Sequence, residues 1–255
     1  MKRLEAKTVV LFGGAGGIGT ACSIRAGTEG ANVVVGSLHS QNAETVAAEI
    51  VGKGGQAIGL GVDIRSEDSI AAVVEAAVRS FGAIDAVHVN AADMSPETVG
   101  KDTDAASIEL DVFDRSVATN LRGYLACTQH VLPHLLERGG GSIVYTSSAA
   151  AFVGEPERPA YAITKGGVTS LVWHVASKWG RDGIRANAVA PGPTVSAAVE
   201  EQLPPGYRDT MLASIRSRRL GRPDDIAAMV VLLLSPEGEW INGQVISVDG
   251  GRTLR

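Results

Sequence analysis

Short apolar runs rich in β-branched residues alternate along this chain with longer stretches that have helical spacing. The runs are apolar at nearly every position, which is typical of strands buried on both faces. Strands that alternate with helices predict a parallel sheet, because parallel neighbours need long crossover connections. The predicted strands are residues 8–12, 32–35, 56–62, 84–89, 142–146, 185–189 and 244–248. The pattern therefore predicts an α/β fold in which helices cover both faces of a doubly wound, seven-stranded parallel sheet.

Polar residues and prolines mark where several helices begin or end. Ser66, followed by two acidic residues, is typical of a helix N-cap. Asp111 and Asp114 resemble a capping pair at the start of a long helix that runs to Leu136. Pro133 should bend that helix or end it early, because proline lacks the N–H that a helix interior needs.

Two connections, residues 93–110 and 192–220, are long for a compact domain and are expected to carry substrate specificity. The acidic stretch 102–114 is expected to be a solvated loop and helix start. Apolar residues in and near the two loops would form one wall of a pocket and favour a hydrophobic or alicyclic substrate. They are Met94, Val153, Leu203, Tyr207, Met211 and Leu212.

Length and composition favour one globular domain spanning residues 1–255. The 31 glycines follow no collagen-like period, and a net charge of −5 argues against a general nucleic-acid binder. Two cysteines cannot form a disulfide framework, and the N-terminal apolar run is too short for a signal peptide. The longest apolar run, residues 226–234, is well below the roughly 18 residues of a membrane span. We expect a cytoplasmic protein with neither a membrane nor a nucleic-acid partner.

Several residues that could suggest chemistry are better interpreted as structural. His130, His134 and Glu137 are spaced like metal ligands, but no second ligand set is visible, so we expect no metal. His88 lies in a predicted strand and is expected to be a satisfied core histidine. Cys127 has no basic neighbour in sequence and is expected to fill the core as a small apolar side chain.

A glycine-rich turn joins the first predicted strand to a helix. Glycines there permit a tight turn and let backbone N–H groups approach a pyrophosphate at the helix N-terminus. Alone the cluster is weak, since a plain strand–helix turn would also use glycine, but its place after the first strand favours a dinucleotide site. No Gly-Lys-Ser/Thr follows, which excludes a P-loop here. The residues concerned are Gly13, Gly16, Gly17, Ile18 and Gly19.

The end of the second predicted strand should contact the adenosine ribose of a dinucleotide. No Asp or Glu is present there to hold a free 2′-hydroxyl, and no Arg or Lys to pair with a 2′-phosphate. Ser37, His39 and Ser40 could donate hydrogen bonds to a phosphate. The choice between NAD and NADP stays open, with NADP favoured.

Tyr161 and Lys165 are four residues apart and therefore share one face of a predicted helix. A free tyrosine is a poor base at neutral pH, but a neighbouring ammonium stabilises the phenolate and lowers its pKa. Ser148 follows the strand predicted at 142–146, at the sheet edge where doubly wound folds bind ligands. Each feature has an ordinary structural alternative, and only their coincidence with the glycine turn indicates catalysis.

With these motifs, the whole chain resembles a single-domain short-chain dehydrogenase/reductase of Rossmann-like fold. The resemblance implies that Tyr161 is the general acid/base and that Lys165 lowers its pKa and holds the nicotinamide ribose. Ser148 would hydrogen-bond the substrate oxygen, and Asn120 would hold a water that links Lys165 to solvent. The remaining markers are Asp63, Asn90-Ala91-Ala92, Pro191-Gly192 and Asp249-Gly250-Gly251.

The resemblance also implies which residues bind the cofactor. Asp63 would contact the adenine amine, and Asn90 the adenosine ribose side. Taken with the glycine turn and the second strand, the expected set is Gly13, Gly16, Gly17, Ile18, Gly19, Ser37, His39, Asp63, Ile64, Asn90, Ala91, Tyr161, Lys165, Pro191, Gly192 and Thr194. The chain departs from the family at Phe12, where a threonine usually ties the glycine turn to the Asn-Ala-Gly segment, and at Ala92, which replaces the glycine.

The expected function is NAD(P)-dependent transfer of a hydride to or from a secondary alcohol or ketone of a small, apolar substrate. A homotetramer is also expected from the family, with the long helices forming one contact and the last strand another. One rival is epimerisation or dehydration of a sugar nucleotide, which usually needs a longer chain. Another is a catalytically silent cofactor-binding regulator, against which Asn120, Ser148, Tyr161 and Lys165 argue.

Overall fold

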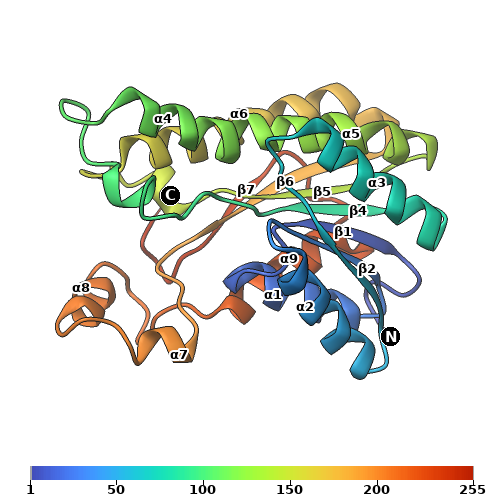
Figure 1. Cartoon of the computed structure of the whole chain (residues 1–255), viewed down its shortest axis with the longest axis horizontal. Coiled ribbons are helices and arrows are strands. Elements are labelled where there is room, and N and C mark those ends of the chain that lie inside the picture. The colour runs from blue at the N-terminus through green and yellow to red at the C-terminus, as the bar shows by residue number, and fades with distance from the viewer. Residues whose placement is uncertain (1, 255) are drawn as a thin grey trace.

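Residues 2–254, which the computed structural model describes, contain one seven-stranded sheet of order β3-β2-β1-β4-β5-β6-β7 (Figure 1). All neighbouring strands are parallel. The predicted doubly wound parallel sheet is therefore confirmed. The strands are β1 Thr8–Phe12, β2 Asn32–Ser37, β3 Gln56–Gly61, β4 Ala86–Val89, β5 Gly141–Thr146, β6 Ile184–Pro191 and β7 Val245–Val248.

Helices cover both faces of the sheet and bury two apolar clusters against it. One face carries α3 (Glu67–Phe81), α5 (Gly123–Glu137) and α6 (Pro159–Trp179), and the other carries α1, α2 and α9 (Figure 1). The latter three span Gly17–Thr28, Ser40–Gly52 and Pro223–Leu234. Because both faces are covered, the strands are apolar along their whole length, as their sequences predicted.

The predicted strands are all present, with differences only at their ends. β6 continues past the predicted residue 189 to Pro191, which pairs with Val248 of β7. A proline is tolerated there because the strand ends at that residue and needs no further ladder N–H. The extension matters because it brings the Pro191-Gly192 segment to the carboxyl edge of the sheet.

The long helix predicted from Asp111 to Leu136 consists of α4 (Leu110–Val117), a π-helical segment (Ala118–Arg122) and α5. The predicted capping role of Asp111 is wrong, because its carboxylate lies within the first turn, 2.7 Å from the Arg115 guanidinium. Pro133 was predicted to bend this helix or end it early, and the early end is wrong, since α5 continues to Glu137. Leu132 and Leu135 are buried in the core, and this packing outweighs the lost backbone hydrogen bond.

The connection 192–220 holds two short helices, α7 (Ala197–Glu200) and α8 (Tyr207–Ala213), which lie away from the sheet (Figure 1). The connection 93–110 lies near the start of α6, where its backbone contacts Arg158. None of the helices described is long and apolar enough to cross a membrane.

Candidate active site

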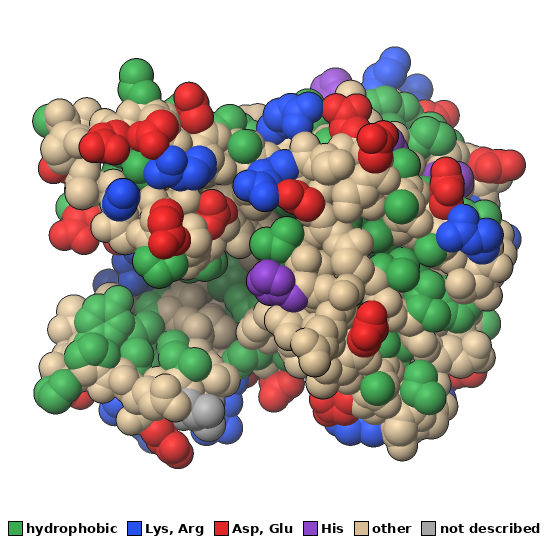
Figure 2. Space-filling view, in the orientation of Figure 1, with side chains coloured by type: hydrophobic (Ala, Val, Ile, Leu, Met, Phe, Trp, Pro, Cys, Tyr) green, Lys and Arg blue, Asp and Glu red, His purple; other side chains and the backbone are tan. Residues whose placement is uncertain are grey.

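A cavity of about 800 Å³ lies at the carboxyl ends of the strands. Its wall comes from the segments that follow β1, β2, β4, β5 and β6, together with α8 and the segment before the C-terminus. Figure 2 shows the hollow between the α7–α8 segment and the body of the molecule. The strand order reverses between β1 and β4, and doubly wound sheets bind their ligands at such a point.

The glycine turn forms one end of this cavity. Gly13 has a φ of +84°, and a Cβ there would collide with the backbone of Ala91. A Cβ on Gly16 or Gly17 would meet nothing, so both glycines leave open space beside the start of α1. That helix has neither a side-chain cap nor an acidic residue in its first turn, which leaves its N–H groups for a ligand. The turn therefore fits the pyrophosphate of a dinucleotide.

A chain of polar side chains, rather than the threonine usual in the family, holds the glycine turn. Asn90 donates from Nδ2 to the Gly13 carbonyl at 3.0 Å. The Thr146 hydroxyl donates to Asn90 Oδ1 at 2.9 Å and receives a hydrogen bond from His88 Nε2 at the same distance. The backbone N–H groups of Asn90 and Ala91 both donate to the Phe12 carbonyl. The turn is thus tied to β4 and β5 without a hydroxyl at position 12.

His88 is completely buried, and burial lowers its pKa to about 3. It is therefore neutral at ordinary pH, with the proton on Nε2, because the Thr146 hydroxyl already donates elsewhere. The prediction of a satisfied core histidine is only half right. Nδ1 has no hydrogen-bond partner among residues 2–254.

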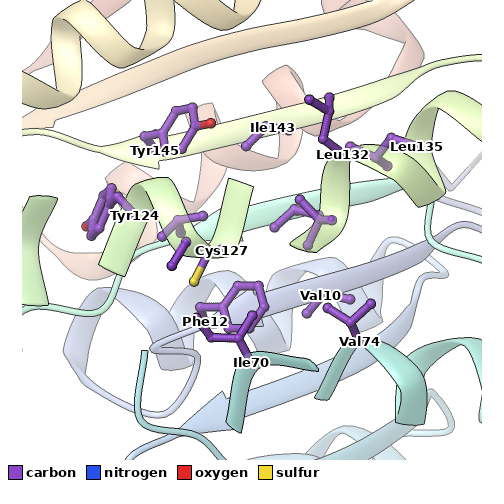
Figure 3. Packing of buried hydrophobic residues seen from close by; sticks show 14 of the residues in the cluster. Val10, Phe12, Ile70, Val74, Tyr124, Cys127, Leu132, Leu135, Ile143 and Tyr145 are labelled. Carbon is purple, nitrogen blue, oxygen red and sulfur yellow. The ribbon is translucent and has the colours of Figure 1, made fainter. Parts of the chain in front are cut away.

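The Phe12 side chain points into the core, although its backbone adjoins the glycine turn. Figure 3 shows its ring beside Ile70 and the sulfur of Cys127, within the buried apolar cluster. Burial raises the pKa of the Cys127 thiol, which agrees with its expected role as an apolar filler. Phe12 therefore contributes core packing, and its backbone carbonyl makes the contacts to the turn.

Of the residues predicted to contact the adenosine part of a cofactor, the structure brings only some to the cavity. Ser37 lies in the wall, and so do Leu38 and Asn42, which the sequence did not single out. His39 is exposed and lies outside the wall. Asn42 went unnoticed because it is the third residue of α2, and an asparagine in a helix carries no local signal of ligand contact.

The two residues predicted after β3 are also outside the cavity wall. The Asp63 carboxylate pairs with the Arg65 guanidinium at 2.7 Å, and this contact lowers the pKa of the carboxyl group. Ile64 is buried and packs against the backbone of Gly123 at the start of α5. On the other side of the cavity, Gly192 and Thr194 follow β6, and the Thr194 hydroxyl donates to the Gly192 carbonyl at 3.0 Å.

Ser148, Tyr161 and Lys165 all line the cavity, as their positions in sequence predicted. Tyr161 and Lys165 lie one turn apart on α6, and Ser148 follows β5. Burial raises the pKa of Tyr161, while the hydrogen bond with Ser148 and then the Arg158 guanidinium oppose that rise. Arg158 is thus a second cation beside Tyr161, which the sequence analysis did not single out.

Lys165 is buried and turned toward the sheet. Its Nζ donates to the Thr146 carbonyl at 2.9 Å and to the Tyr124 hydroxyl at 3.1 Å. The same Nζ lies 5.8 Å from the centre of the Tyr161 ring. Burial lowers the pKa of Lys165 to about 7. The charged form thus depends on the two oxygen acceptors that face it.

Asn120 is completely buried in the π-helical segment between α4 and α5. Its Oδ1 accepts a hydrogen bond from the backbone N–H of Asp93 at 2.9 Å. Its Nδ2 finds no hydrogen-bond partner within the part of the chain that the structure describes. Single π-turns inside α-helices are frequent at functional sites, since they re-aim one side chain.

At the start of α6, the structure corrects the expectation that the whole acidic stretch 102–114 is solvated. Asp102 was expected to be solvated with the rest of its acidic stretch, but it is only 4% exposed. Its carboxylate accepts from the backbone N–H groups of Ala160 at 3.1 Å and Tyr161 at 2.9 Å. The carboxylate replaces water as the partner of these N–H groups and fixes the turn that carries Tyr161.

The half of the cavity away from the glycine turn, called the far half below, is only partly the apolar pocket that was predicted. Met94, Tyr207 and Met211 line it, whereas the other three predicted apolar residues are absent from the wall. The predicted residues outside it are Val153, Leu203 and Leu212. Three charged side chains that the sequence analysis did not identify lie in the wall instead: Glu155, Arg158 and Arg252. Nothing local marks them, because Arg252 is almost a hundred residues from Glu155 in the sequence.

Comparison with known proteins finds relatives that match almost the whole chain. A family model described as enoyl-(acyl carrier protein) reductase matches residues 13–253. The 3-oxoacyl-[acyl-carrier-protein] reductase FabG of Thermotoga maritima is 33% identical over 252 residues, which cover 99% of this chain and 100% of that protein. A 7alpha-hydroxysteroid dehydrogenase of Bacteroides fragilis is 31% identical over 254 residues, with coverage of 100% and 97%.

The chain also has the same fold as a solved structure of a 7alpha-hydroxysteroid dehydrogenase in complex with NADH and 7-oxo glycochenodeoxycholic acid. The TM-score is 0.89 at 31% identity, and the match covers 99% of this chain and 97% of the other. The chain belongs to the short-chain dehydrogenase/reductase family, whose members are oxidoreductases that use nicotinamide cofactors. The resemblance stated from the sequence is thereby confirmed.

Proposed function

We propose that this protein transfers a hydride between NAD(P) and a secondary alcohol or ketone, with Tyr161 as the general acid/base. The observation that supports this most is the convergence of Ser148, Tyr161 and Lys165 on one wall of the cavity that the glycine turn closes. The relatives support the same reaction, since their names refer to an oxoacyl group and to a hydroxysteroid. A bound nicotinamide would supply or accept the hydride.

In the reductive direction, the substrate oxygen accepts hydrogen bonds from Ser148 and Tyr161. Tyr161 then donates its proton as negative charge develops on that oxygen. The raised pKa of Tyr161 keeps its hydroxyl protonated at neutral pH, which suits an acid. In the oxidative direction the same hydroxyl must lose its proton, which the charges of Arg158 and Lys165 favour.

Lys165 and Asn120 would return the proton to Tyr161. Lys165 contacts the Tyr124 hydroxyl on the side away from solvent. Asn120 Nδ2 has no partner among the described residues and can hold a water between Lys165 and the surface. Lys165 would also hydrogen-bond the nicotinamide ribose, with Pro191, Gly192 and Thr194 against the nicotinamide.

For the cofactor, the proposal favours NADP. Among residues 2–254, no acidic side chain lines the cavity beside Ser37 and Asn42, so a 2′-phosphate there meets no like charge from them. Ser37, and His39 after a rotation of its exposed side chain, would donate to that phosphate. Dissociation constants for NADPH and NADH, measured by quenching of protein fluorescence, test this choice. Tenfold tighter binding of NADH would contradict it.

Tyr161→Phe tests the proposed chemistry. Each of a panel of ketones and secondary alcohols is incubated with both cofactors, and the absorbance of the reduced nicotinamide is followed. Tyr161→Phe should lower kcat at least a hundredfold, within the range that a general acid/base contributes, with cofactor binding unchanged. Rates within threefold of the wild type would exclude Tyr161 as the acid/base. Tight cofactor binding without any turnover by the wild type would favour the silent regulator.

The proposed assembly is a homotetramer through the α5 and α6 faces and the β7 edge. Three large apolar side chains on these helices are exposed in the single chain by 46%, 55% and 56%: Leu125, Ile163 and Trp173. Exposed apolar groups gathered on neighbouring helices are typical of an interface. Light scattering during size exclusion should give four times the mass of the chain, and a monomer at micromolar concentration would contradict the assembly.

A further inference from the structure

The far half of the cavity carries a connected group of charged side chains beside Tyr161. The Arg158 guanidinium lies 3.2 Å from Glu155 Oε1, and the Arg252 guanidinium lies 3.5 Å from Glu155 Oε2. Arg252 also donates to the Ser214 hydroxyl at 3.2 Å. All three charged residues line the cavity, so one carboxylate there faces two guanidinium groups. The group has a net charge of +1.

The arginines have donors to spare. A guanidinium carries five N–H donors, and a single carboxylate cannot satisfy two such groups. Beyond Glu155 and the Tyr161 ring, the contacts described for residues 2–254 give the Arg158 side chain no further partner. The side chains of Arg158 and Arg252 are 35% and 25% exposed, while Glu155 is 12% exposed. The uncommitted donors are therefore accessible from the cavity.

Both arginines are held in place by the backbone around them. Arg158 has φ 61° and ψ 53°, a left-handed conformation that costs a non-glycine residue on the order of 1 kcal/mol. Its N–H donates to the Thr103 carbonyl at 3.0 Å, and its guanidinium lies 5.7 Å from the centre of the Tyr161 ring. Strain of this kind is concentrated at functional sites.

Arg252 is positioned by the turn that begins at Asp249. The Asp249 carboxylate accepts from the N–H groups of Gly251 at 2.9 Å and Thr253 at 2.8 Å, one on each side of Arg252. Gly250 and Gly251 have φ values of +64° and +79°, which the turn requires. A guanidinium on a fixed turn loses less conformational freedom when it binds a ligand.

We propose that Arg158 and Arg252 bind a carboxylate of the substrate, so that the substrate is an oxo acid or the corresponding hydroxy acid. This inference rests on the proposed function, because the reacting oxygen must lie at Ser148 and Tyr161. Since Arg158 contacts the Tyr161 ring, the carboxylate lies a few bonds from the carbon that exchanges the hydride. A single net positive charge matches one carboxylate better than the dianion of a phosphate. Arginine forks match carboxylate geometry with two parallel hydrogen bonds.

The experiment compares substrates that differ only in this charge. A series of oxo acids with the ketone at increasing distance from the carboxylate is assayed beside the methyl esters of the same acids. The wild type should prefer at least one acid over its ester about tenfold or more in kcat/KM, the size of one charge-assisted contact. Added salt should raise the KM of the acid and leave that of the ester unchanged.

Two variants should change this preference in opposite directions. Arg252→Gln should raise the KM of the acid about tenfold while kcat and the KM of the ester stay near wild type. Glu155→Gln removes the competing carboxylate and should lower the KM of the acid severalfold. Arg79→Gln is the control: Arg79 is on the outer face of α3 and 69% exposed, and its loss changes the net charge as Arg252→Gln does. It should leave the KM of both acid and ester unchanged. Thermal midpoint and cofactor affinity report the fold of each variant.

The outcomes separate the substrate inference from the proposed function. Turnover of esters or neutral ketones with no preference for any acid overturns the inference and leaves the proposed function standing. Equal losses of kcat/KM for acid and ester in Arg252→Gln would show that the charged group only holds the C-terminal segment in place. That result also overturns the inference. If Arg252→Gln does not fold, Arg252→Lys must lower the preference without abolishing it. If the wild type turns over ketones of the wider panel but nothing in this series, the inference is overturned. If it binds cofactor and turns over nothing in either set, the proposed function is refuted and the inference with it.

Discussion

At the scale of residues, the contacts of Lys165 differ from those that its spacing from Tyr161 suggested. Spacing places it beside Tyr161, but its Nζ bonds the Tyr124 hydroxyl and the Thr146 carbonyl. Tyr124 is completely buried, and burial raises the pKa of its own hydroxyl, so it stays neutral and can accept from Lys165. The cost of burying Lys165 as a cation is thus offset by two oxygen acceptors.

Tyr124→Phe tests this dependence. Losing one acceptor should lower the pKa of Lys165 from about 7 by about one to two units, because a hydrogen bond to a charged group contributes about 1.5–3 kcal/mol. If ketone reduction needs the cation, the basic limb of the kcat/KM profile must move to lower pH. The profile is measured from pH 5 to 10. Thr45→Val, on the surface of α2, is the control, and identical limbs for all three proteins would contradict the role of Tyr124.

At the scale of elements, two helices have side chains that cap their N-terminal N–H groups. One is α3, and the other is α6, which carries Tyr161. Ser66 was predicted as the cap of α3, and its hydroxyl accepts from the Ser69 N–H at 3.3 Å. Asp102 lies far in sequence from α6 and yet its carboxylate binds the first N–H groups of that helix. The first cap is local and was predictable, whereas the second depends on how the 93–110 connection folds back.

The two caps should respond differently to alanine. Ser66→Ala should lower the free energy of unfolding by about 1 kcal/mol, the usual value of an N-cap, without changing kcat. Asp102→Ala should cost about 1–3 kcal/mol, because buried N–H groups lose their partner, and it should also lower kcat at least tenfold by loosening Tyr161. Urea unfolding and steady-state rates measure both effects. Unchanged kcat in Asp102→Ala would show that this cap supports the helix alone.

The whole molecule places the ends of the cavity that we propose for cofactor and substrate on one sheet edge. The glycine turn follows β1, the Ser148 segment follows β5, and Arg252 follows β7, so strands distant in sequence supply one site. A ligand that spans this edge contacts segments from both halves of the sheet. Its binding free energy therefore adds to the stability of the entire fold.

Cofactor binding should accordingly raise the thermal midpoint of the whole chain. At a hundred times the dissociation constant, NADPH should add about 2.7 kcal/mol to the free energy of unfolding. Gly13→Ala should abolish this increase, because its Cβ would collide with the Ala91 backbone at a φ that only glycine adopts readily. Gly100→Ala, with open space around it, is the matched control. A full shift in Gly13→Ala would mean that the cofactor does not use this turn.

The sequence by itself determined what depends on local pattern. Apolar runs specified the parallel sheet, glycines marked the turn before α1, and a spacing of four placed Tyr161 and Lys165 on one face of α6. These features are readable because helix and strand periods relate neighbouring residues directly. The family followed from their combination.

The tertiary structure alone decided which distant groups meet. Asp102 reaches the start of α6, His88 reaches Asn90 through Thr146, and Arg252 reaches Glu155. Each contact joins residues separated by tens of positions or passes between strands, so no periodicity predicts it. Their charges and hydrogen bonds act only after apolar burial has brought β1, β4, β5 and β7 to one edge. For this reason the sequence predicted the reaction chemistry, and the folded chain decided what surrounds Tyr161.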